Sequence, residues 1–224
     1  MNIKYRLVLL IALVLIFWKA SSHFNIFESD RQKSESNIGD NTEVIKVSVY
    51  YEALCSDSRN FIINQLAPAY EDLHEHIKLD FVPYGKAKTH ENDGKITFTC
   101  QHGPTECQAN KIHACVLDII PEQRIQLKYV SCMIYDNIVP LEALERCGKE
   151  LKIDYNPVVD CLNSNRADLL LRTYGIQTDA VTPHITFIPT IEFDGTLNVK
   201  LSLVLKDFRN VLCSLYKSKP KGCS

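Results

Sequence analysis

Nine cysteines constrain this chain more than any other feature, because a predicted secretion signal precedes them. In the oxidising compartments that such signals lead to, cysteines pair into disulfide bridges, so nine cysteines predict four bridges and one free thiol. The sequence leaves the pairing open, since eight cysteines allow about 105 connectivities. The nine are Cys55, Cys100, Cys107, Cys115, Cys132, Cys147, Cys161, Cys213 and Cys223.

The first 22 residues have the pattern of a secretory signal peptide. Two basic residues precede an apolar run from Leu7 to Trp18, and small residues follow as far as Ser22. The run is too short to cross a bilayer, which takes about 20 residues, so we predict cleavage near Ser22. An uncleaved signal anchor is the alternative. Residues 23–43 are polar and aperiodic, which predicts a flexible lead-in to the folded domain.

The rest of the sequence predicts a soluble protein outside the cytosol. It contains no second long apolar run and ends without a KDEL-type signal, which favours secretion or an endolysosomal destination. It contains no N-x-S/T sequon, so we do not expect delivery to lysosomes through attached glycans. A net charge of -2 gives no basic surface for nucleic acid. We also expect no membrane contact after the signal has been cleaved.

The first part of the folded region has the order strand, helix, strand. Residues 44–51 are β-branched and aromatic, which predicts a buried strand. Residues 58–76 carry apolar side chains at helical spacing, and Pro68 within them predicts a kink. Residues 77–85 predict a second strand. It runs parallel to the first, because a helix connects the two through a right-handed crossover.

The middle and last parts complete an α/β fold. From residue 85 to about residue 183 the sequence carries six cysteines and several helical segments, which predicts a disulfide-rich helical insertion. Asp194 and Gly195 then predict the turn of a hairpin, and an amphipathic helix follows to about Tyr216. The order β-α-β, insertion, β-β-α is that of a thioredoxin-like fold. We place this domain at residues 44–217, followed by a C-terminal tail at 218–224.

Cys55 is the cysteine that we predict to be free, because its surroundings have the spacing of a redox pair. Ser58 follows it at the position of the second sulfur in a C-x-x-C site. Cys55 falls between the first strand and the first helical turn, where unpaired backbone N–H groups stabilise a thiolate. The carboxylates of Glu52 and Asp57 oppose this effect and Arg59 can offset them, so the sequence leaves the balance open.

Pro189 is the second residue that the predicted layout brings to the site. It opens the third strand, a position at which thioredoxin folds hold a cis-proline beside the nucleophile as a backbone platform for substrate. A cis bond before proline is uncommon, so this expectation depends on the layout and not on the proline alone. We predict that Pro189 binds substrate next to Cys55.

Four stretches of the sequence together resemble one protein family. The family is that of the gamma-interferon-inducible lysosomal thiol reductases, GILT, in the form seen in GILT-like proteins of invertebrates. The similarity runs from about Val44 to Cys223. The stretches are YYEALCSDSRNFIINQLAP, VPYGKA, CQHGPTECQANKIHACVLD and TPHITFIPTIEFDG. The family signature C-Q-H-G-x-x-E-C-x-x-N-x-x-x-x-C is met by Cys100, Gln101, His102, Gly103, Glu106, Cys107, Asn110 and Cys115.

The resemblance implies a thioredoxin-like reductase of protein disulfides that acts in acidic endolysosomal or secreted settings. Family members carry C-x-x-C at the positions of Cys55 and Ser58, so the serine departs from the family. We expect no metal and no prosthetic cofactor, and an external small thiol such as glutathione or cysteine as the reductant. The expected partners are disulfide-containing protein substrates. A disulfide-linked homodimer through Cys223 stays open.

Three features keep an alternative interpretation. Cys55 is either a nucleophile or a buried, inert thiol. The signature cysteines are either bridged or bind zinc together with His102 and His113, although an oxidising compartment favours bridges. The polar groups of His102, Glu106 and Asn110 either contact the active site or form caps and hydrogen bonds within the insertion.

Two functions of different classes therefore remain. In the first, the protein is a thiol-disulfide oxidoreductase in which Cys55 attacks a substrate disulfide. Ser58 cannot resolve the resulting mixed disulfide, so release needs an external thiol or a substrate thiol, which predicts monothiol reduction or isomerisation. In the second, the protein is a catalytically impaired secreted binding protein that holds partners on the same scaffold. The reactivity of Cys55 separates the two.

Overall fold

The structure is a computed structural model that describes residues 43–223. The predicted signal peptide at 1–22 lies outside the described residues, as do positions 23–42 of the predicted lead-in and Ser224. Within residues 43–223, no helix is both long enough and apolar enough to cross a membrane.

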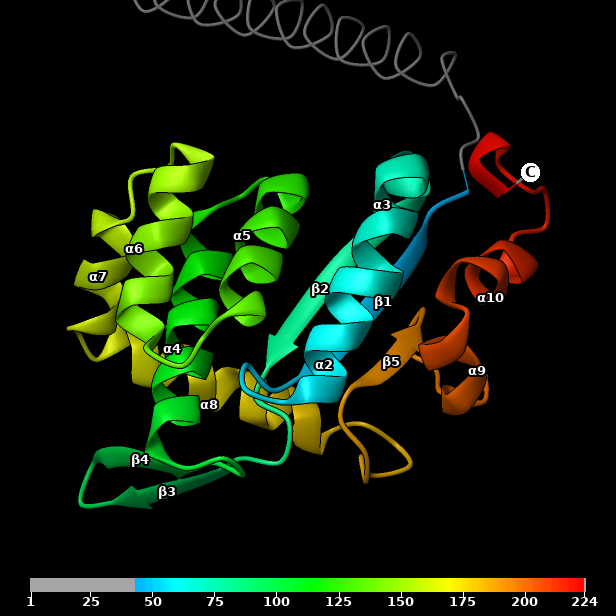
Figure 1. The fold of residues 1–224 in the computed structure, drawn as a ribbon. Helices are drawn as coiled ribbons and strands as arrows, with labels where there is room; N and C mark the ends of the chain where they lie inside the picture. The colour runs from blue at the N-terminus through cyan, green and yellow to red at the C-terminus, as the bar shows by residue number, and fades with distance from the viewer. Residues whose placement is uncertain (1–42, 224) are drawn as a thin grey trace, which may run out of the picture. The chain divides into compact units, whose positions relative to one another are not determined.

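A three-stranded sheet forms the centre of the described domain and consists of β1 (Ile45–Tyr51), β2 (Ile77–Pro83) and β5 (Thr190–Phe193). β1 lies between the other two strands (Figure 1). It runs parallel to β2, with Ile45 opposite Ile77, and antiparallel to β5, with Val49 opposite Ile191. The apolar side chains that predicted β1 are buried because neighbouring elements cover both faces of this central strand.

One face of the sheet is covered by an interrupted helix that connects β1 to β2. It consists of α2 (Ser56–Phe61), a π-helical turn (Ile62–Leu66) and α3 (Ala67–Leu73), and a 3-10 turn (His74–His76) leads on to β2. Pro68 has no N–H to donate, and in the π-helical turn before it the N–H of Ala67 bonds to the carbonyl of Ile62. The irregularity that Pro68 predicted is therefore present as a π-helical turn.

The end of the chain closes the same face. After β5 come α9 (Leu201–Lys206) and α10 (Phe208–Leu215), and a 3-10 turn (Lys221–Cys223) ends the described residues. The rings of Phe61 in α2 and Phe208 in α10 pack edge to face with their centres 5.4 Å apart. Both rings are buried in the main apolar core, which also contains Val47, Val49 and Leu66.

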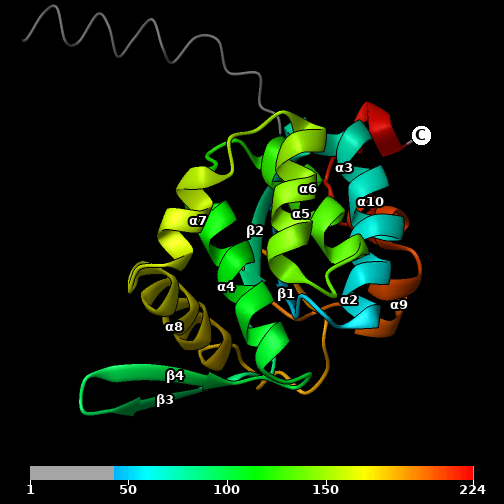
Figure 2. The same ribbon diagram turned by 60° about the vertical axis from the view of Figure 1, so that its left-hand side comes forward.

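The region predicted as a helical insertion holds a hairpin and five helices. The hairpin consists of β3 (Lys88–Asn92) and β4 (Lys95–Thr99), and the helices are α4 (Pro104–Ile119), α5 (Gln123–Tyr135), α6 (Pro140–Leu151), α7 (Asn156–Leu162) and α8 (Arg166–Asp179). α4 contacts each of the other four helices and also β2. The hairpin lies at the end of the domain toward which β1 and β2 run (Figures 1 and 2).

The structure gives the disulfide pairing that the sequence left open. Three bridges lie within the insertion and one joins α10 to the end of the chain. Because Cys223 is already bridged to Cys213, it offers no free thiol for a disulfide-linked homodimer. The bridges are Cys100–Cys107, Cys115–Cys161, Cys132–Cys147 and Cys213–Cys223.

The hairpin predicted at Asp194 and Gly195 is only partly formed. Both residues have the positive φ that the turn requires, 50° and 72°. Beyond the turn, pairing is limited to one bridge between Phe193 and Thr196, because the chain leaves the sheet to begin α9 at Leu201. The prediction of a second strand after this turn is therefore wrong. The final helix, expected to be continuous, is also divided between α9 and α10.

Candidate active site around Cys55

Cys55 lies at the junction between β1 and α2, and its thiol is free and half-buried. Its N–H bonds to the carbonyl of Glu52 at 3.2 Å, which closes a tight turn after β1. Its own carbonyl accepts the N–H of Arg59 at 3.0 Å, so the helical hydrogen bonds begin at Cys55. The thiol therefore lies at the start of a helix, where backbone N–H groups have no partners within the helix.

The segment that leads into β5 lies beside this thiol. The Cys55 thiol donates a hydrogen bond to the carbonyl oxygen of Ile188, with 3.7 Å between sulfur and oxygen. The peptide bond from Ile188 to Pro189 is cis. The structure thus brings Pro189 to Cys55, through a contact with Ile188 that spans 133 positions of the chain. A second cis bond, Thr182–Pro183, was not anticipated.

Ser58 lies one helical turn after Cys55 and is fully buried. Its hydroxyl oxygen accepts the N–H of Glu52 at 3.4 Å, a long hydrogen bond to the loop before Cys55. The serine thus helps to hold this loop in place. It carries no sulfur that can exchange with a disulfide.

A surface pocket of about 170 Å³ opens next to Cys55. One side is formed by residues 53–56 and by Arg59, and the other by residues 134–138, where α5 ends. This volume is below the range of roughly 300 to 1,000 Å³ that small-molecule sites occupy. The pocket is therefore large enough for a side chain of a bound polypeptide and too small for a typical cofactor.

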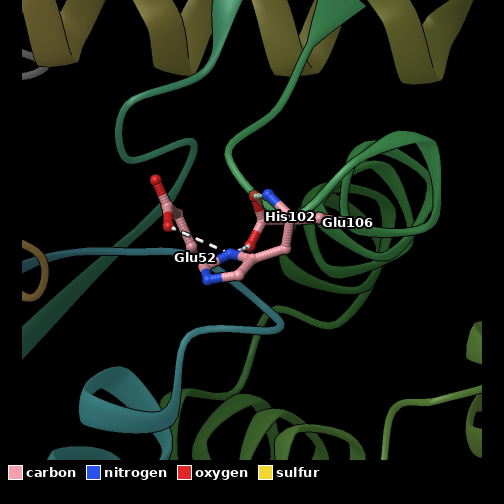
Figure 3. A group of neighbouring side chains, drawn as sticks. All are labelled: Glu52, His102 and Glu106. Atoms are coloured by element: carbon pink, nitrogen blue, oxygen red, sulfur yellow. Dashed lines mark hydrogen bonds and ion pairs between the residues drawn. The ribbon is translucent and has the colours of Figure 1, made fainter.

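Three polar side chains converge next to the loop between β1 and Cys55, as Figure 3 shows. They are Glu52 after β1, His102 before α4, and Glu106 in the first turn of α4. Nδ1 of His102 lies 2.5 Å from Oε2 of Glu106 and 3.6 Å from Oε2 of Glu52. The N–H of His102 also donates to Oε1 of Glu106 at 3.0 Å. Both carboxyl groups are buried, whereas the histidine is partly exposed.

Burial is the main influence on the Glu52 carboxyl group. It raises the pKa of Glu52, the N–H of Lys86 opposes it by donating to Oε1 at 2.8 Å, and the charge of Glu106 raises the pKa further. Oε2 of Glu52 is buried without a hydrogen-bond partner. The folded protein therefore favours a neutral Glu52 more than an unfolded chain does.

The same three side chains have the donors that a metal ion requires. One imidazole nitrogen and two carboxylate oxygens lie within 4.8 Å of one another, a set that Zn²⁺ or Mn²⁺ accepts. The zinc site considered from the sequence is a different one, and it is wrong. Its signature cysteines are oxidised in the Cys100–Cys107 and Cys115–Cys161 bridges.

Two asparagines of the insertion hold the loop between β1 and Cys55 in place. The N–H of Ala53 donates to Oδ1 of Asn110 in α4 at 2.9 Å, and the carbonyl of Ala53 accepts Nδ2 of Asn137 at 3.3 Å. Asn110 is fully buried and Asn137 nearly so. Both roles open for the polar signature residues are therefore present. Asn110 and His102 contact the loop before Cys55, and His102 and Glu106 also bond to each other within the insertion.

His113 lies deeper, away from the thiol. It is fully buried on α4, and burial lowers its pKa to about 3. Its Nδ1 is 2.9 Å from the hydroxyl of Tyr51 at the end of β1. His113 therefore joins the insertion to the sheet as a neutral side chain.

The residues that the sequence did not indicate are those at the end of α5. Tyr135, Asn137 and Ile138 line the Cys55 pocket, yet they lie some eighty positions from Cys55 along the chain. A signal was present. The run Tyr135 to Val139 places apolar residues between two helices, where polar loop residues are the rule.

A family model and individual relatives match the sequence of this chain, and they point to the same family. The family model described as "Gamma interferon inducible lysosomal thiol reductase (GILT)" matches residues 46–151. A GILT-like protein of Anopheles gambiae is 33% identical over 195 residues, which cover 80% of this chain and 80% of the relative. GILT-like protein 1 of Drosophila melanogaster is 34% identical over 175 residues, covering 70% and 69%.

Solved structures give the fold alone. The structure of Chlamydia trachomatis DsbA superposes with a TM-score of 0.53 at 16% identity and covers 78% of this chain and 91% of its own. MdbA, a thiol-disulfide oxidoreductase from Actinomyces oris, superposes with a TM-score of 0.54 at 14% identity, covering 82% and 85%. These similarities confirm the predicted thioredoxin-like fold.

Proposed function

This chain belongs to the gamma-interferon-inducible lysosomal thiol reductase family, and we propose that it is a thiol-disulfide oxidoreductase that acts on protein disulfides through one nucleophile, Cys55. The observation that carries the proposal is the free, half-buried thiol of Cys55 at the start of α2, in contact with the carbonyl before Pro189. The eight other cysteines are bridged. We assign substrate binding to Pro189, because its peptide lies beside the sulfur.

The reaction begins when Cys55 loses its proton to solvent. The thiolate attacks one sulfur of a substrate disulfide, a bond forms between that sulfur and Sγ of Cys55, and the substrate S–S bond breaks. The second substrate sulfur leaves as a thiolate and takes a proton from water. The product is a mixed disulfide between the protein and its substrate.

Release requires a second thiol that this chain does not supply. In dithiol enzymes the second cysteine of C-x-x-C attacks the mixed disulfide, and the hydroxyl of Ser58 cannot do so. A small thiol such as glutathione or cysteine therefore attacks, and a second equivalent completes the transfer, so that two small thiols become one disulfide while the substrate disulfide becomes two thiols. A thiol elsewhere on the substrate can attack instead, which isomerises the disulfide with no net reduction.

The setting follows from the same proposal. The substrates are disulfide-containing proteins, and the compartment is endolysosomal or extracellular, reached after cleavage of a signal peptide at residues 1–22. The functional unit is the domain at 44–217 with its insertion at about 85–183. The chemistry needs no prosthetic cofactor, because cysteine sulfurs alone exchange the electrons.

A trapping experiment on three proteins tests the proposal. Wild type, Cys55→Ser and Ser58→Cys are mixed with a denatured, disulfide-containing protein, quenched with acid and run on a non-reducing gel. We expect wild type to accumulate mixed disulfides that added small thiol discharges. Cys55→Ser forms none. Ser58→Cys shortens the life of the adduct and releases reduced substrate once without added thiol, because the new sulfur attacks the mixed disulfide and is left in a disulfide with Cys55. Further rounds then need an external thiol.

The same gel identifies the competing function. If wild type and Cys55→Ser trap equally little and Ser58→Cys gains nothing, Cys55 is not a working nucleophile. The protein is then a catalytically impaired binding protein on this scaffold. Denaturant melts of all three proteins serve as the control for folding, because Ser58 is fully buried.

A further inference from the structure

We propose that the turn between α5 and α6 is a polypeptide-binding subsite for the apolar residues that flank a disulfide in an unfolded substrate protein. The subsite consists of Tyr135, Ile138 and Val139, which we call the apolar platform. The inference rests on the function proposed for Cys55 and specifies which disulfides that thiol selects.

The first observation is the exposure of the apolar platform. Tyr135, Ile138 and Val139 are 70%, 81% and 48% exposed. With Leu141 they account for four of the nine large apolar side chains that are exposed among residues 43–223, although they lie within seven consecutive positions. Single exposed apolar residues are common on protein surfaces, but a gathered group marks an interaction site.

The second observation is continuity with the thiol. Tyr135 and Ile138 line the same pocket as Cys55. A polypeptide joined to Cys55 through a mixed disulfide therefore places its neighbouring side chains against the platform. The pocket, at about 170 Å³, accepts one such side chain, while the exposed faces of Tyr135 and Ile138 extend the contact along an elongated chain.

The third observation is that the platform is fixed in position relative to the thiol. Asn137, between Tyr135 and Ile138, is buried and donates to the carbonyl of Ala53, two residues before Cys55. The guanidinium of Arg146 in α6 donates to the carbonyl and to the carboxylate of Asp136, each at 3.0 Å. A platform held in this way binds without first having to be ordered, which strengthens binding.

These observations favour an unfolded polypeptide as the occupant. Apolar side chains next to a disulfide are buried in a folded protein and exposed in an unfolded one, so the platform discriminates between these two states. A small disulfide such as oxidised glutathione has no apolar side chain to place there. A second copy of this chain on the platform would cover Cys55, which the proposed reaction requires to be accessible.

The test compares two disulfides on two double variants. Tyr135→Ser/Ile138→Ser removes the two platform residues that line the Cys55 pocket, and Leu169→Ser/Ile176→Ser removes two apolar residues of α8, 46% and 59% exposed, as the control. With a denatured, disulfide-intact protein we expect the platform variant to form mixed disulfides at least about tenfold more slowly than wild type. With oxidised glutathione its rate stays within about twofold of wild type, as does that of the control with both substrates.

A non-covalent measurement keeps the platform testable if Cys55 proves unreactive. An S-alkylated, unfolded protein is titrated onto Cys55→Ser by fluorescence anisotropy, with and without the platform substitutions. A weaker affinity only in the platform variant supports the subsite even if trapping fails, and then it is the proposed function that is lost. Equal affinity, or equal slowing by the control variant, overturns the subsite. A wild-type dimer in sedimentation that the platform variant abolishes also overturns it, because the occupant is then a second copy.

Discussion

The sheet and the helical insertion are held together by different means, and the candidate active site lies where they meet. β1, β2 and α2–α3 are held by burial in the main apolar core, and no disulfide joins any two of these elements. The insertion has a smaller core around α4 and contains three of the four bridges. The loop before Cys55 belongs to the sheet side but is held by Asn110 and Asn137 of the insertion.

The free thiol and the bridged cysteines differ in their surroundings. Each bridge has at least one cysteine that is buried, whereas the Cys55 thiol is half-exposed beside a pocket. Packing thus keeps a small thiol from the Cys100–Cys107 and Cys115–Cys161 bridges, in which both cysteines are buried, whereas Cys132 and Cys223 are, like Cys55, only partly buried. The sheet side, which carries Cys55, is thus stabilised by burial, and the insertion is stabilised by disulfides as well as by its own core.

Breaking a long bridge is the strongest way to test this division. The double variant Cys115→Ala/Cys161→Ala removes a bridge between cysteines 46 positions apart in the sequence. Cys100→Ala/Cys107→Ala removes a bridge between cysteines 7 positions apart. Loop-closure entropy predicts losses of about 4 and about 2.4 kcal/mol in the free energy of unfolding. Denaturant melts measure both, and amide exchange should rise in α4 and α7 while β1 and β2 stay protected.

An equal loss of protection in the strands would contradict the comparison, because the sheet would then depend on the bridges as much as the insertion does. Cys213→Ala/Cys223→Ala is the matched control, with a separation of 10 residues at the far end of the chain. It should leave exchange in α4 unchanged.

Lowering the pH is a second test of the insertion, with a smaller expected loss of stability, because it protonates His113 when the chain unfolds. Its pKa is about 3 in the folded protein and about 6.5 when unfolded, so the folded state binds fewer protons between these values. The stability that His113 contributes is complete above about pH 6.5 and is lost as pH falls, by about 2 kcal/mol at pH 5. His113→Gln should remove this part of the difference between melts at pH 7.5 and pH 5.0. An unchanged difference would show that His113 is not neutral and buried in solution.

The smallest effect is expected from Glu52 on the sheet side, and its sign is opposite. Burial raises the pKa of Glu52, so its contribution to stability is present below the unfolded value of about 4.5 and is lost as pH rises through the folded value. Glu52→Gln stays neutral and keeps an acceptor for the N–H of Lys86. Relative to wild type, the variant should therefore gain stability between pH 4 and pH 7.5. A relative loss over this range would mean that His102 holds Glu52 as a stabilised carboxylate.

Two Asp-Gly pairs show how far local sequence determines this fold. Asp194-Gly195 has the turn geometry that was predicted, yet its second strand is reduced to one bridge because the chain departs for α9. Asp93-Gly94 attracted no prediction, yet it closes the full β3–β4 hairpin, with positive φ at both residues. The turn is local, whereas the length of the ladder depends on where the next element packs.

The candidate site also has a part that local sequence determines and a part that depends on packing. Cys55 and Ser58 lie within one segment, and their placement after a strand and at the start of a helix follows from hydrophobic pattern alone. His102 and the apolar platform come from two other segments, which approach the loop that carries Glu52 and Cys55. Their proximity depends on how α4 packs against β2 and on how α5 packs against α2 and α3, which no spacing in the sequence specifies.

The hydrogen bond from Cys55 to Ile188 also has a consequence for biosynthesis. Cys55 is the first cysteine of the chain to be synthesised, and the carbonyl that its thiol contacts follows 133 residues later. During synthesis the emerging chain therefore carries a thiol that is ready for oxidation well before the segment that lies against it exists. Six of the eight framework cysteines appear in the interval, so each of the six is a competing partner for Cys55 until β5 is in place. A product truncated before residue 188 would keep the nucleophile and lack the site.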